Sequence, residues 1–468
     1  MASRTGAVER AYDKMDGGAY LDDLARRIAI PTESQVPERA GDLERYQRDE
    51  MAPSFEAMGF TCTTLDNPVP ERGPVLVAQR LEDEARPTVL IYGHGDVVRS
   101  IPDEWSDGLD PYEMKIVDDR VYGRGSVDNK GQHTLAMSAL QSVLEERGGH
   151  LGFNAKFIIE TGEEQGSPGL GEIVETSKDL LAADVFIGFD GPRKSFGRMD
   201  LNLGCRGGVF FDLIVDLGRT GGLHSGHWGG VMPDAGIILA QALASITTPK
   251  GKILIDEWVP QSVPDAVLQA CRDLVVDPVP GMPVPDPEWG ESSLTPRERT
   301  LAWTSFIVLA FVTGNPDNPV NSVPSTAQAR CQIRHTVDVP RENFMPALRR
   351  HLDAHGFEGV EIGMDIGRNQ FAASRTDPNH PWVQWMRRSV VSTTGNEPNI
   401  LPCSSGSNPS ELFKAGLDVP VIWMPHSYSG CHQHGADEHG LKSLFREGLG
   451  TVAALYWDLG EEGTPARA

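Results

Sequence analysis

The chain has 468 residues, more than one hydrophobic core usually serves, so at least two domains are expected. Hydrophobic residues make up 39% and charged residues 23%, as in ordinary globular proteins, and no apolar run reaches the roughly 18 to 20 residues of a membrane-spanning helix. The formal net charge of -24 disfavours nucleic acid and anionic membranes as partners, since both are negatively charged.

The cysteines and the N-terminal segment both favour a cytoplasmic location. The six cysteines are scattered without a C-x-x-C pair, which indicates reduced thiols rather than a disulfide framework or a zinc ribbon. The opening segment, MASRTGAVERAYDKMDG, contains no apolar signal-peptide core. Any metal ion is therefore expected to be held by His and carboxylate side chains.

Strands and helices alternate in the first part of the chain. The apolar run PTVLIYGHGDVV (87–98) is typical of a parallel strand that is buried on both faces. A helix is predicted within 133–147, because its leucine, alanine and valine residues share one face. The next predicted elements are a strand at the start of AKFIIETGEEQGSPGL (155–170), a helical segment near 169–182 and a strand in ADVFIGFDG (183–191). This alternation predicts an α/β layered sheet.

The pattern changes after Arg206. A strand is predicted in GGVFFDLIVDLG (207–218), and another in 325–339, where Ala327, Ala329, Cys331 and Ile333 alternate onto one face. The remaining predicted elements here are a helix in 233–246, a Pro-rich loop at 275–290, a helix in 342–356 with a Gly C-cap signal and a strand in 359–367. Half-exposed strands with helices between them predict a small α+β domain inserted into the larger one.

The first pattern returns after about residue 370. A helix is predicted in PWVQWMRRSVV (381–391), an apolar strand in VPVIWMP (419–425) and a closing helix from about Glu438 to Trp457. The sheet domain is therefore expected to be discontinuous. The predicted boundaries are 1–203 for the first part of the catalytic domain, 204–370 for the lid or dimerisation domain and 371–468 for the second part of the catalytic domain.

Charged side chains follow the apolar strands where the strands end. His94 and Asp96 close the first run as His-x-Asp, and Glu163 and Glu164 follow the strand of the second. Three further residues have the same placement: Asp128 in GSVDNKG, Asp190 at the end of VFIGFDG and His434 in CHQHGADEH. Ligands bind at this edge of open α/β sheets, so these seven side chains are expected to converge there.

Their joint position favours a metal site. A lone His-x-Asp is usually a capped turn, and a lone Glu-Glu pair is usually a solvated surface. Here, however, the carboxylates follow apolar strands that cannot solvate charge. Adjacent like charges cost free energy unless a cation lies between them or one of them carries a proton. Imidazole and carboxylate ligands in this mixture suit borderline cations such as Zn²⁺.

The motifs together resemble a known family. In this order along the chain, YGHGDVV, GRGSVDNKGQ, ETGEEQGSPGL, GFDGPR, GGLHSGHWGG and CHQHGADEH are similar to segments of the two-metal exopeptidase and amidohydrolase family. That family includes carnosinase-type cytosolic dipeptidases, carboxypeptidase G, aminoacylase and succinyl-diaminopimelate desuccinylase. The resemblance covers nearly the whole chain and implies a catalytic α/β/α sheet domain interrupted by a smaller α+β lid or dimerisation domain.

The resemblance implies two divalent metal ions per chain. Asp128 would bridge them, with His94 and Asp190 as further ligands of one ion and Glu164 and His434 as further ligands of the other. Zn²⁺ is the expected metal, with Mn²⁺ and Co²⁺ as alternatives, because affinity follows the Irving–Williams order while cellular supply decides occupancy.

Two further carboxylates receive catalytic roles by the same resemblance. Asp96 would hydrogen-bond the imidazole of His94 and fix its tautomer and orientation. Glu163 would be the general base, which takes a proton from metal-activated water and passes it to the leaving amine. This assignment explains the adjacent carboxylates, since Glu164 is compensated by metal while Glu163 handles the proton.

The C-terminal metal ligand has several candidates by chemistry alone. His426, His432, His434 and His439 lie in one segment. The family's closing motif places the ligand four residues before a Glu, which His434 and Glu438 match. His434 is therefore predicted as the ligand, with His432 left open as the alternative.

The inserted domain contributes a predicted catalytic histidine. GGLHSGHWGG resembles the lid motif whose first His, here His224, reaches the active site of the partner subunit in dimeric members and stabilises the oxyanion. The chain is therefore expected to form a homodimer through the inserted domain. The alternative is a Gly-rich turn with a structural His.

Three residues are predicted to bind the substrate's terminal carboxylate. Arg334 in ARCQIRHTVDVP matches the lid arginine that forms a planar bidentate fork, although Arg330 lies on the same strand face four residues earlier. Gly406 and Ser407 lie in SSGSNPSE, which resembles the loop whose backbone amides complete the pocket. This loop departs from the family's usual Gly-Gly-Ser, because Ser405 occupies the first position.

The predicted function is hydrolysis of the amide bond of dipeptides or short peptides. The alternative is an N-acyl amino acid amidohydrolase with the same metal site, since selectivity depends on the shape of the lid pocket. A third possibility, a catalytically inactive binding or scaffolding protein, is disfavoured because such a protein has no need of an unliganded carboxylate at Glu163.

Overall fold

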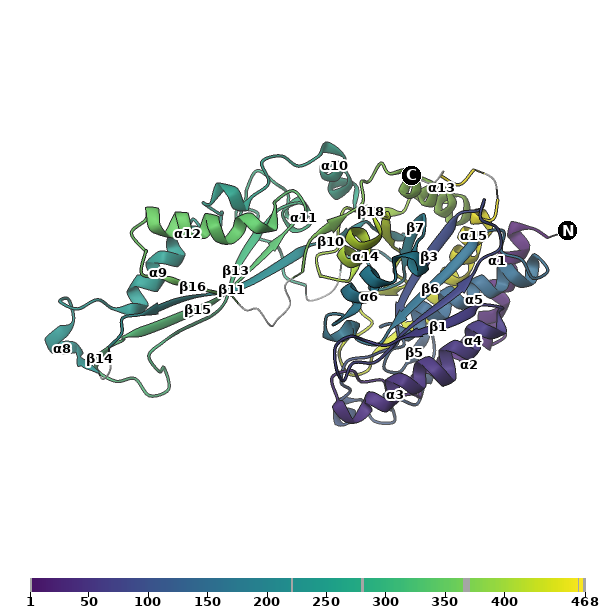
Figure 1. The fold of residues 1–468 in the computed structure, drawn as a ribbon, viewed down its shortest axis with the longest axis horizontal. Helices are drawn as coiled ribbons and strands as arrows, with labels where there is room; N and C mark the ends of the chain where they lie inside the picture. Colours follow the sequence, from purple (N-terminus) through teal and green to yellow (C-terminus); the bar gives the residue numbers. More distant parts are fainter. Residues whose placement is uncertain (1, 220–221, 279–281, 365–370, 462, 466–468) are drawn as a thin grey trace.

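The computed structural model describes residues 2–219, 222–278, 282–364, 371–461 and 463–465. The chain forms two structural parts, which Figure 1 shows side by side along the long axis of the molecule. One part contains an eight-stranded sheet with helices on both faces, and the other a four-stranded sheet with helices against it. The predicted α/β class with an inserted smaller domain is therefore confirmed, and the exact boundary residues of 204–370 stay a prediction.

The large sheet is mixed, and its central strands are parallel. Its strands lie in the order β1 (Thr61–Leu65), β2 (Val75–Arg80), β6 (Asn154–Glu160), β3 (Thr88–His94), β7 (Val185–Gly188), β19 (Val421–Trp423), β9 (Asp200–Asn202) and β18 (Asn399–Leu401). Strands β6, β3, β7 and β19 run parallel to one another. Every residue of β3 and β6 is buried, as their continuous apolar runs predict.

Helices cover both faces of this sheet and complete two hydrophobic cores (Figure 1). Helix α1 packs on α15 through Ala7, Ala11 and Met15, which are spaced four residues apart and buried. The helices of the larger core are α1 (Arg4–Asp16), α2 (Ala19–Ile28), α4 (Ala52–Ala57), α5 (Lys130–Glu146), α13 (Pro381–Thr394) and α15 (Lys442–Leu459). Those of the smaller core are α6 (Leu170–Thr176), α7 (Lys178–Leu181) and α14 (Ser410–Leu417). The short α3 (Ala40–Arg45) precedes α4.

The inserted part is built on an antiparallel sheet. Its strands lie in the order β13 (Ser305–Thr313), β15 (Thr326–His335), β11 (Gly207–Asp216) and β16 (Glu361–Met364). Residues of β11 alternate between buried and half-buried, so that its apolar side chains form one core with α9 (Ala235–Ile246) and α12 (Phe344–Ala354). Trp258 lies fully buried in this core and donates its indole N–H to the carbonyl oxygen of Phe344.

Short strand pairs connect and extend the two parts. They are β10 (Gly204–Cys205) with β17 (Ser374–Arg375), β8 (Pro192–Arg193) with β20 (Ser427–Tyr428), β12 (Leu223–His224) with β14 (Ser322–Val323), and the ribbon of β4 (Lys115–Val117), β5 (Arg120–Tyr122) and β21 (His439–Leu441). Helix α8 (Ser225–Trp228) follows β12 at the end of the inserted part that lies farthest from the large sheet (Figure 1).

The predicted elements are present in the part of the chain that the structure describes, while 365–367 of the strand predicted in 359–367 and 279–281 of the predicted Pro-rich loop lie outside it. Three differences have physical reasons. The closing helix begins at Lys442 rather than near Glu438, because His439–Leu441 pairs with β5. Strand β13 was not predicted, although its run SFIVLAFVT is apolar throughout. Helices α10 (Asp265–Asp273) and α11 (Pro296–Leu301), inside the range predicted for the lid, form a small core with Leu401 and Cys403 beside β18 of the large sheet.

Within the described ranges, no helix combines the length and the apolar character needed to cross a membrane.

Candidate metal and active site

The carboxyl ends of the parallel strands bring the predicted site residues to one edge of the large sheet. Strand β3 ends at His94, and β6, its parallel neighbour, leads into the turn of Glu163 and Glu164. Strand β7, on the other side of β3, leads into Asp190. These side chains come from distant parts of the sequence and meet because parallel strands end together.

The first group of possible metal ligands consists of His94, Asp128 and Asp190. One ligand atom of each lies within 4.8 Å of the others. The Nε2 atom of His94 is 3.1 Å from Oδ1 of Asp128 and 3.9 Å from Oδ2 of Asp190. His94 and Asp128 are buried, and Asp190 is half-buried.

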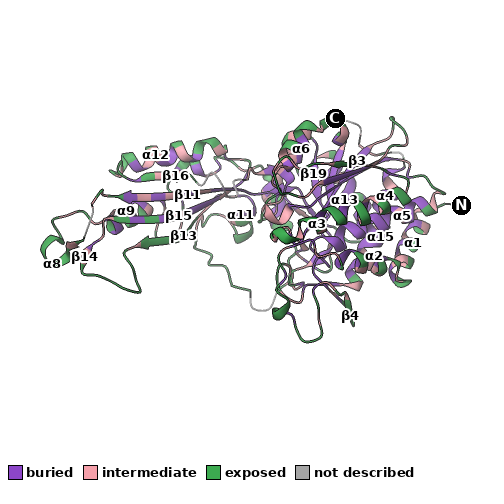
Figure 2. Cartoon of the chain, turned by 60° about the horizontal axis from the view of Figure 1, so that its bottom comes forward, coloured by how far each residue is buried: buried purple, intermediate pink, exposed green. Residues whose placement is uncertain are grey.

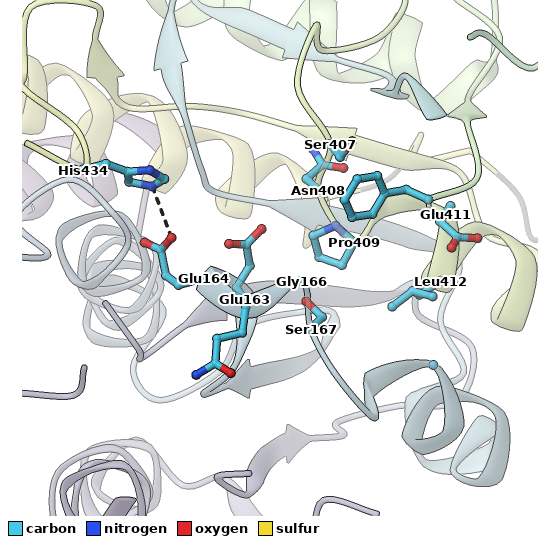
Figure 3. A pocket seen from close by; sticks show the side chains of 13 residues that line it. Glu163, Glu164, Gly166, Ser167, Ser407, Asn408, Pro409, Glu411, Leu412 and His434 are labelled. Atoms are coloured by element: carbon cyan, nitrogen blue, oxygen red, sulfur yellow. Dashed lines mark ion pairs between the residues drawn. The ribbon is translucent and has the colours of Figure 1, made fainter. Parts of the chain in front are cut away.

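The second group shares Asp128 with the first and adds Glu164 and His434. The Nε2 atom of His434 is 2.8 Å from Oδ2 of Asp128 and 3.2 Å from Oε2 of Glu164 (Figure 3). The other carboxylate oxygen of Glu164, Oε1, is buried and has no hydrogen-bond partner among the described residues. An ion held between these side chains would satisfy that oxygen, so the residues present fit two divalent cations, one at each ligand group, with Asp128 common to both groups.

The electrostatics of the two groups also favour bound cations. Burial, followed by the charge of Asp128, raises the pKa of Glu164 to about 8 and that of Asp190 to about 6. Hydrogen bonds to Asp128 and Glu164 raise the pKa of His434 to about 11. Carboxylates crowded in a buried site resist ionisation unless positive charge is near, and divalent cations provide that charge.

Asp96 positions the turn that carries the two glutamates. Its Oδ1 and Oδ2 atoms accept the backbone N–H groups of Glu163 and Glu164, each at 3.2 Å. The Nδ1 atom of His94 lies 3.0 Å from the backbone oxygen of Asp96 and 3.4 Å from its carboxylate. The imidazole is thus oriented by Asp96, with the backbone oxygen as the nearer acceptor rather than the carboxylate that the sequence had suggested.

Glu163 lies in the same site but outside both ligand groups. Its carboxylate accepts no hydrogen bond from the described residues, and Figure 3 shows it next to Glu164 in the cavity. Burial raises the pKa of Glu163 well above its usual value. A free carboxylate with high proton affinity beside a metal site is suited to accept and return a proton.

A buried ion pair that the sequence analysis did not identify holds Asp128 in place. Glu438 is fully buried, accepts the N–H of Asp128 at 3.2 Å and that of Val127 at 3.0 Å, and pairs with Arg124 at 2.6 Å. Arg124 also donates to the carbonyl oxygen of Gly435, in the loop that carries His434. In the sequence, Glu438 is distinguished only by its position four residues after His434, and nothing near it predicts its ion pair with Arg124.

The structure separates the four C-terminal histidines. Of these, His434 alone belongs to a ligand group formed by the described residues. His426 is buried against Phe189, His432 bonds to the carbonyl oxygen of Ala436, and His439 bonds to the hydroxyl of Tyr428. The assignment of His434 as the ligand stays a prediction for a binding experiment.

Of the three residues predicted to bind a carboxylate, Gly406 and Ser407 line a cavity at the site, and Arg334 contacts Ser407. Arg334 donates through Nη1 to the hydroxyl of Ser407 at 2.8 Å, and no carboxylate of the described residues pairs with it. Arg330, the alternative, is paired with Asp212 at 2.9 Å. Gly406 and Ser407 line a cavity together with Glu163 and Asp190. Arg334 thus has no carboxylate partner among the described residues, although its Nε and Nη2 atoms face the amide of Gln332 at 3.1 and 3.2 Å, whereas Arg330 is engaged in an ion pair.

His224 does not lie at the metal ligands of its own chain. It is exposed between β12 and α8, at the opposite end of the molecule from the large sheet (Figure 1). Its Nδ1 atom accepts the N–H of Gly226 at 3.1 Å. In the neutral ring the proton is therefore on Nε2, which is free to donate a hydrogen bond.

Comparison with known proteins identifies the family to which the chain belongs. Residues 90–457 match the Peptidase family M20/M25/M40. The chain is 31% identical to the Cys-Gly metallodipeptidase of Saccharomyces cerevisiae, over 93% of this chain and 94% of that protein. It is 27% identical to the cysteinylglycine-S-conjugate dipeptidase of Corynebacterium striatum, over 89% of this chain and 90% of that protein.

Solved structures share the fold. Human carnosine dipeptidase 1 matches 97% of this chain and 98% of its own, with a TM-score of 0.72 and 22% identity. A metallo-carboxypeptidase from Sulfolobus solfataricus matches 94% of this chain and 99% of its own, with a TM-score of 0.74 and 22% identity. The family and the amide-bond-hydrolysing metallopeptidase class predicted from the motifs are thus confirmed: the chain belongs to the Peptidase family M20/M25/M40.

Proposed function

We propose that this protein is a metal-dependent dipeptidase. The observation that carries the proposal is the pair of ligand groups sharing Asp128, with the unliganded Glu163 beside them. The relatives at 27% and 31% identity are named as dipeptidases, which supports a dipeptide as the substrate. The cavity at Glu163 and Glu164 has a volume of about 420 Å³, a size suited to a small ligand such as a short peptide.

The chain's own residues divide the chemistry among them. His94, Asp128 and Asp190 would hold one divalent ion, and Asp128, Glu164 and His434 the other. Two such ions, when bound, lower the pKa of water and polarise a substrate carbonyl. Glu163 accepts a proton on its carboxylate from the attacking water and returns it to the nitrogen of the leaving amine.

The carboxylate end of the substrate is proposed to bind at Arg334, Gly406 and Ser407. The guanidinium of Arg334 has no carboxylate partner among the described residues and is already oriented by Ser407. A planar fork of this kind binds a carboxylate through two hydrogen bonds. This anchor would place the scissile bond at a fixed distance from Glu163.

An acidic side chain that could bind the free amino group of the substrate favours a dipeptidase over an N-acyl amino acid hydrolase. The cavity of about 420 Å³ is lined by one further acidic residue, Glu411, which belongs to neither ligand group and is not the proposed base. Glu411 forms no ion pair with the described residues. Figure 3 shows it across the cavity from His434. An ammonium group of the substrate could bind there, whereas an acyl group offers no charge to Glu411.

The paired-substrate experiment tests this function. Ala-Ala should be hydrolysed by the metal-loaded enzyme with kcat/KM at least roughly 10-fold above that of N-acetyl-Ala, in which an acetyl group replaces the aminoacyl group and the ammonium contact is absent. The measurement is release of the C-terminal amino acid from both substrates. Faster cleavage of the acetylated member would replace the dipeptidase proposal by the deacylase alternative.

Zn²⁺ is the proposed metal, because the ligand set combines imidazole and carboxylate donors, and Zn²⁺ binds such sites more tightly than Mn²⁺ or Co²⁺. A cytoplasmic location is proposed because all six cysteines are free, as expected in a reducing compartment.

A homodimer through the inserted domain is proposed from an exposed apolar edge. Among the residues that the structure describes, strand β13 pairs with β15 alone and has an open second edge. It exposes Val308, Leu309 and Val312, the last by 58% (Figure 2). On α9, Ile237 is 64% exposed. An open apolar edge strand is a site for pairing with another chain, and a second copy offers the same edge in a two-fold arrangement.

The dimer would also give His224 its role. Because His224 lies at the far end of its own chain, we propose that its Nε2–H group donates to the oxyanion in the partner's site. His224→Ala should lower kcat by roughly 10²- to 10³-fold, as expected for the loss of one oxyanion donor, without changing metal content.

Mixing two inactive variants tests whether the site is shared. Chains with His224→Ala and chains with Glu163→Gln each form inactive homodimers, but a heterodimer has one site with an intact Glu163 and an intact His224 from the partner. After subunit exchange, activity should return to at most half the wild-type value per heterodimer. If exchange is demonstrated by mass spectrometry and activity stays absent, the shared-site proposal is wrong.

A further inference from the structure

Two cavities meet at the proposed catalytic carboxylate. The larger one, of about 420 Å³, extends from Glu163 and Glu164 to Glu411. The smaller one, of about 280 Å³, extends from Glu163 and Asp190 to Lys194. Both are lined by Glu163, Ser407, Asn408 and His434, so a substrate held over the metal ligands has room on both sides.

Apart from the proposed metal ligands and base, the two cavities are lined by residues of opposite charge. Glu411 is the additional charged residue of the larger cavity, and Lys194 that of the smaller cavity. The carboxylates that line the smaller cavity are Asp128, Glu163 and Asp190, all of which belong to the proposed metal and base machinery. With Glu164, these four negative charges offset two divalent cations, so Lys194 leaves the smaller cavity with a net positive charge.

The main chain of Lys194 is fixed while its ammonium group is free. Its N–H donates to Oδ2 of Asp200 at 2.7 Å, and its carbonyl oxygen accepts from the N–H of Asp277 at 2.9 Å. Asp200 is fully buried, and its other oxygen accepts from Asn399, so this carboxylate attracts Lys194 but forms no ion pair with its Nζ atom. Among the described residues no carboxylate lies within ion-pair distance of that Nζ.

A second polar group faces the same cavity without a partner. Asn202 is 8% exposed, lines the smaller cavity, and has no hydrogen bond to its Oδ1 atom from the described residues. This oxygen is shielded from solvent, whereas the Nδ2 group of the same amide also has no hydrogen-bond partner among the described residues and is not shielded. Its N–H groups can therefore donate to a carboxylate in the cavity.

We infer that the smaller cavity binds a second carboxylate of the substrate, in addition to the terminal one, through Lys194 and Asn202. The preferred substrates are then dipeptides with an Asp or Glu side chain. This inference rests on the proposed dipeptidase function and names the substrate class of that site. The protein's net charge of -24 repels anions at long range, so such a preference must come from these local contacts.

The test compares acidic dipeptides with their neutral amides in both positions. Kinetics are measured for Asp-Ala against Asn-Ala and for Ala-Asp against Ala-Asn, with wild type, Lys194→Gln and Lys194→Glu. Wild type should prefer the acidic member at one of the two positions by roughly 10-fold in kcat/KM, mainly through KM. Lys194→Gln should reduce this ratio to about one, and Lys194→Glu should reverse it.

A surface lysine supplies the matched control. Lys178 pairs with Glu175 at 2.6 Å on the surface, and Lys178→Gln removes the same charge from the protein without altering the cavity. This variant should keep the wild-type preference for the acidic substrate. Equal kcat/KM for acidic and amide members at both positions in wild type, or a preference that survives in Lys194→Gln, overturns the inference.

Equilibrium binding separates the two proposals. Calorimetry with metal-loaded Glu163→Gln protein measures the affinity for the same four dipeptides in the absence of turnover. If wild type cleaves none of them but Glu163→Gln binds the acidic member more tightly and loses this preference with Lys194→Gln, the dipeptidase proposal fails, whereas the binding of a carboxylate in the smaller cavity through Lys194 stands. If the dipeptides are cleaved but bind with equal affinity, the inference fails and the dipeptidase proposal stands.

Discussion

Glu163→Gln should reduce kcat by about 10²- to 10⁴-fold while the protein keeps two metal ions per chain. The carboxylate of Glu163 belongs to neither ligand group, so its conversion to an amide removes no ligand. An amide cannot accept the proton that the base must take, although its shape is nearly that of the acid. The measurements are kcat on a dipeptide and metal content by mass spectrometry of the elements.

The neighbouring residue is the matched control. Glu164→Gln makes the same chemical change one position away, in the same turn, but alters a residue that contacts Asp128 and His434 through the second ligand group. This variant should lose about one ion per chain. If Glu163→Gln loses metal and Glu164→Gln does not, the roles of the two glutamates must be exchanged.

Asp128→Ala should lower occupancy of both metal sites and abolish hydrolysis. Asp128 is the one residue common to the two ligand groups, and its two oxygens face His94 and His434 respectively. Without it, each group would retain only two protein ligands. The expected result is fewer than one ion per chain after dialysis, measured beside a circular dichroism spectrum that shows whether the fold is kept.

Asp190→Ala distinguishes a bridge from an ordinary ligand. Asp190 belongs to the first group alone, so its removal should affect one ion and leave the other bound. Loss of only one ion from Asp128→Ala as well would contradict the bridging role of Asp128.

The large sheet was predictable from sequence because its central strands are buried on both faces. Such strands need continuous apolar runs, and β3 and β6 have them. The same burial explains why a carboxylate directly after an apolar strand stands out in the sequence from the solvated acids elsewhere. Asp96, Glu163 and Glu164 have this placement, and in the structure the carboxylate of Asp96 accepts the N–H groups of the two glutamates.

Strand β13 was not predictable by the same reasoning. Its apolar run has no alternation, and a short run of this kind cannot be told from part of a buried helix by periodicity. In the structure most residues of β13 are exposed, although an apolar run of this kind is expected to be buried. The partner that would cover it is not encoded in the local pattern.

Long-range contacts account for the remaining differences. Glu438 lies in a short run of polar residues, and only its tertiary contacts with Arg124 and the N–H of Asp128 reveal its role. The packing of α10 and α11 beside β18 likewise joins residues about one hundred positions apart or more. The spacing of Glu438 from His434 does not reveal its contacts with Arg124 and Asp128, and the packing of α10 and α11 leaves no periodic signal in the sequence.

Metal titration of the stripped enzyme tests the two-metal account most directly. The protein is freed of metal with a chelator, Zn²⁺ is added in known equivalents, and hydrolysis of a dipeptide is followed at each step. The account predicts no activity in the stripped protein and a rise that reaches its maximum at two equivalents per chain. Full activity in the presence of the chelator, or a maximum at one equivalent, would contradict it.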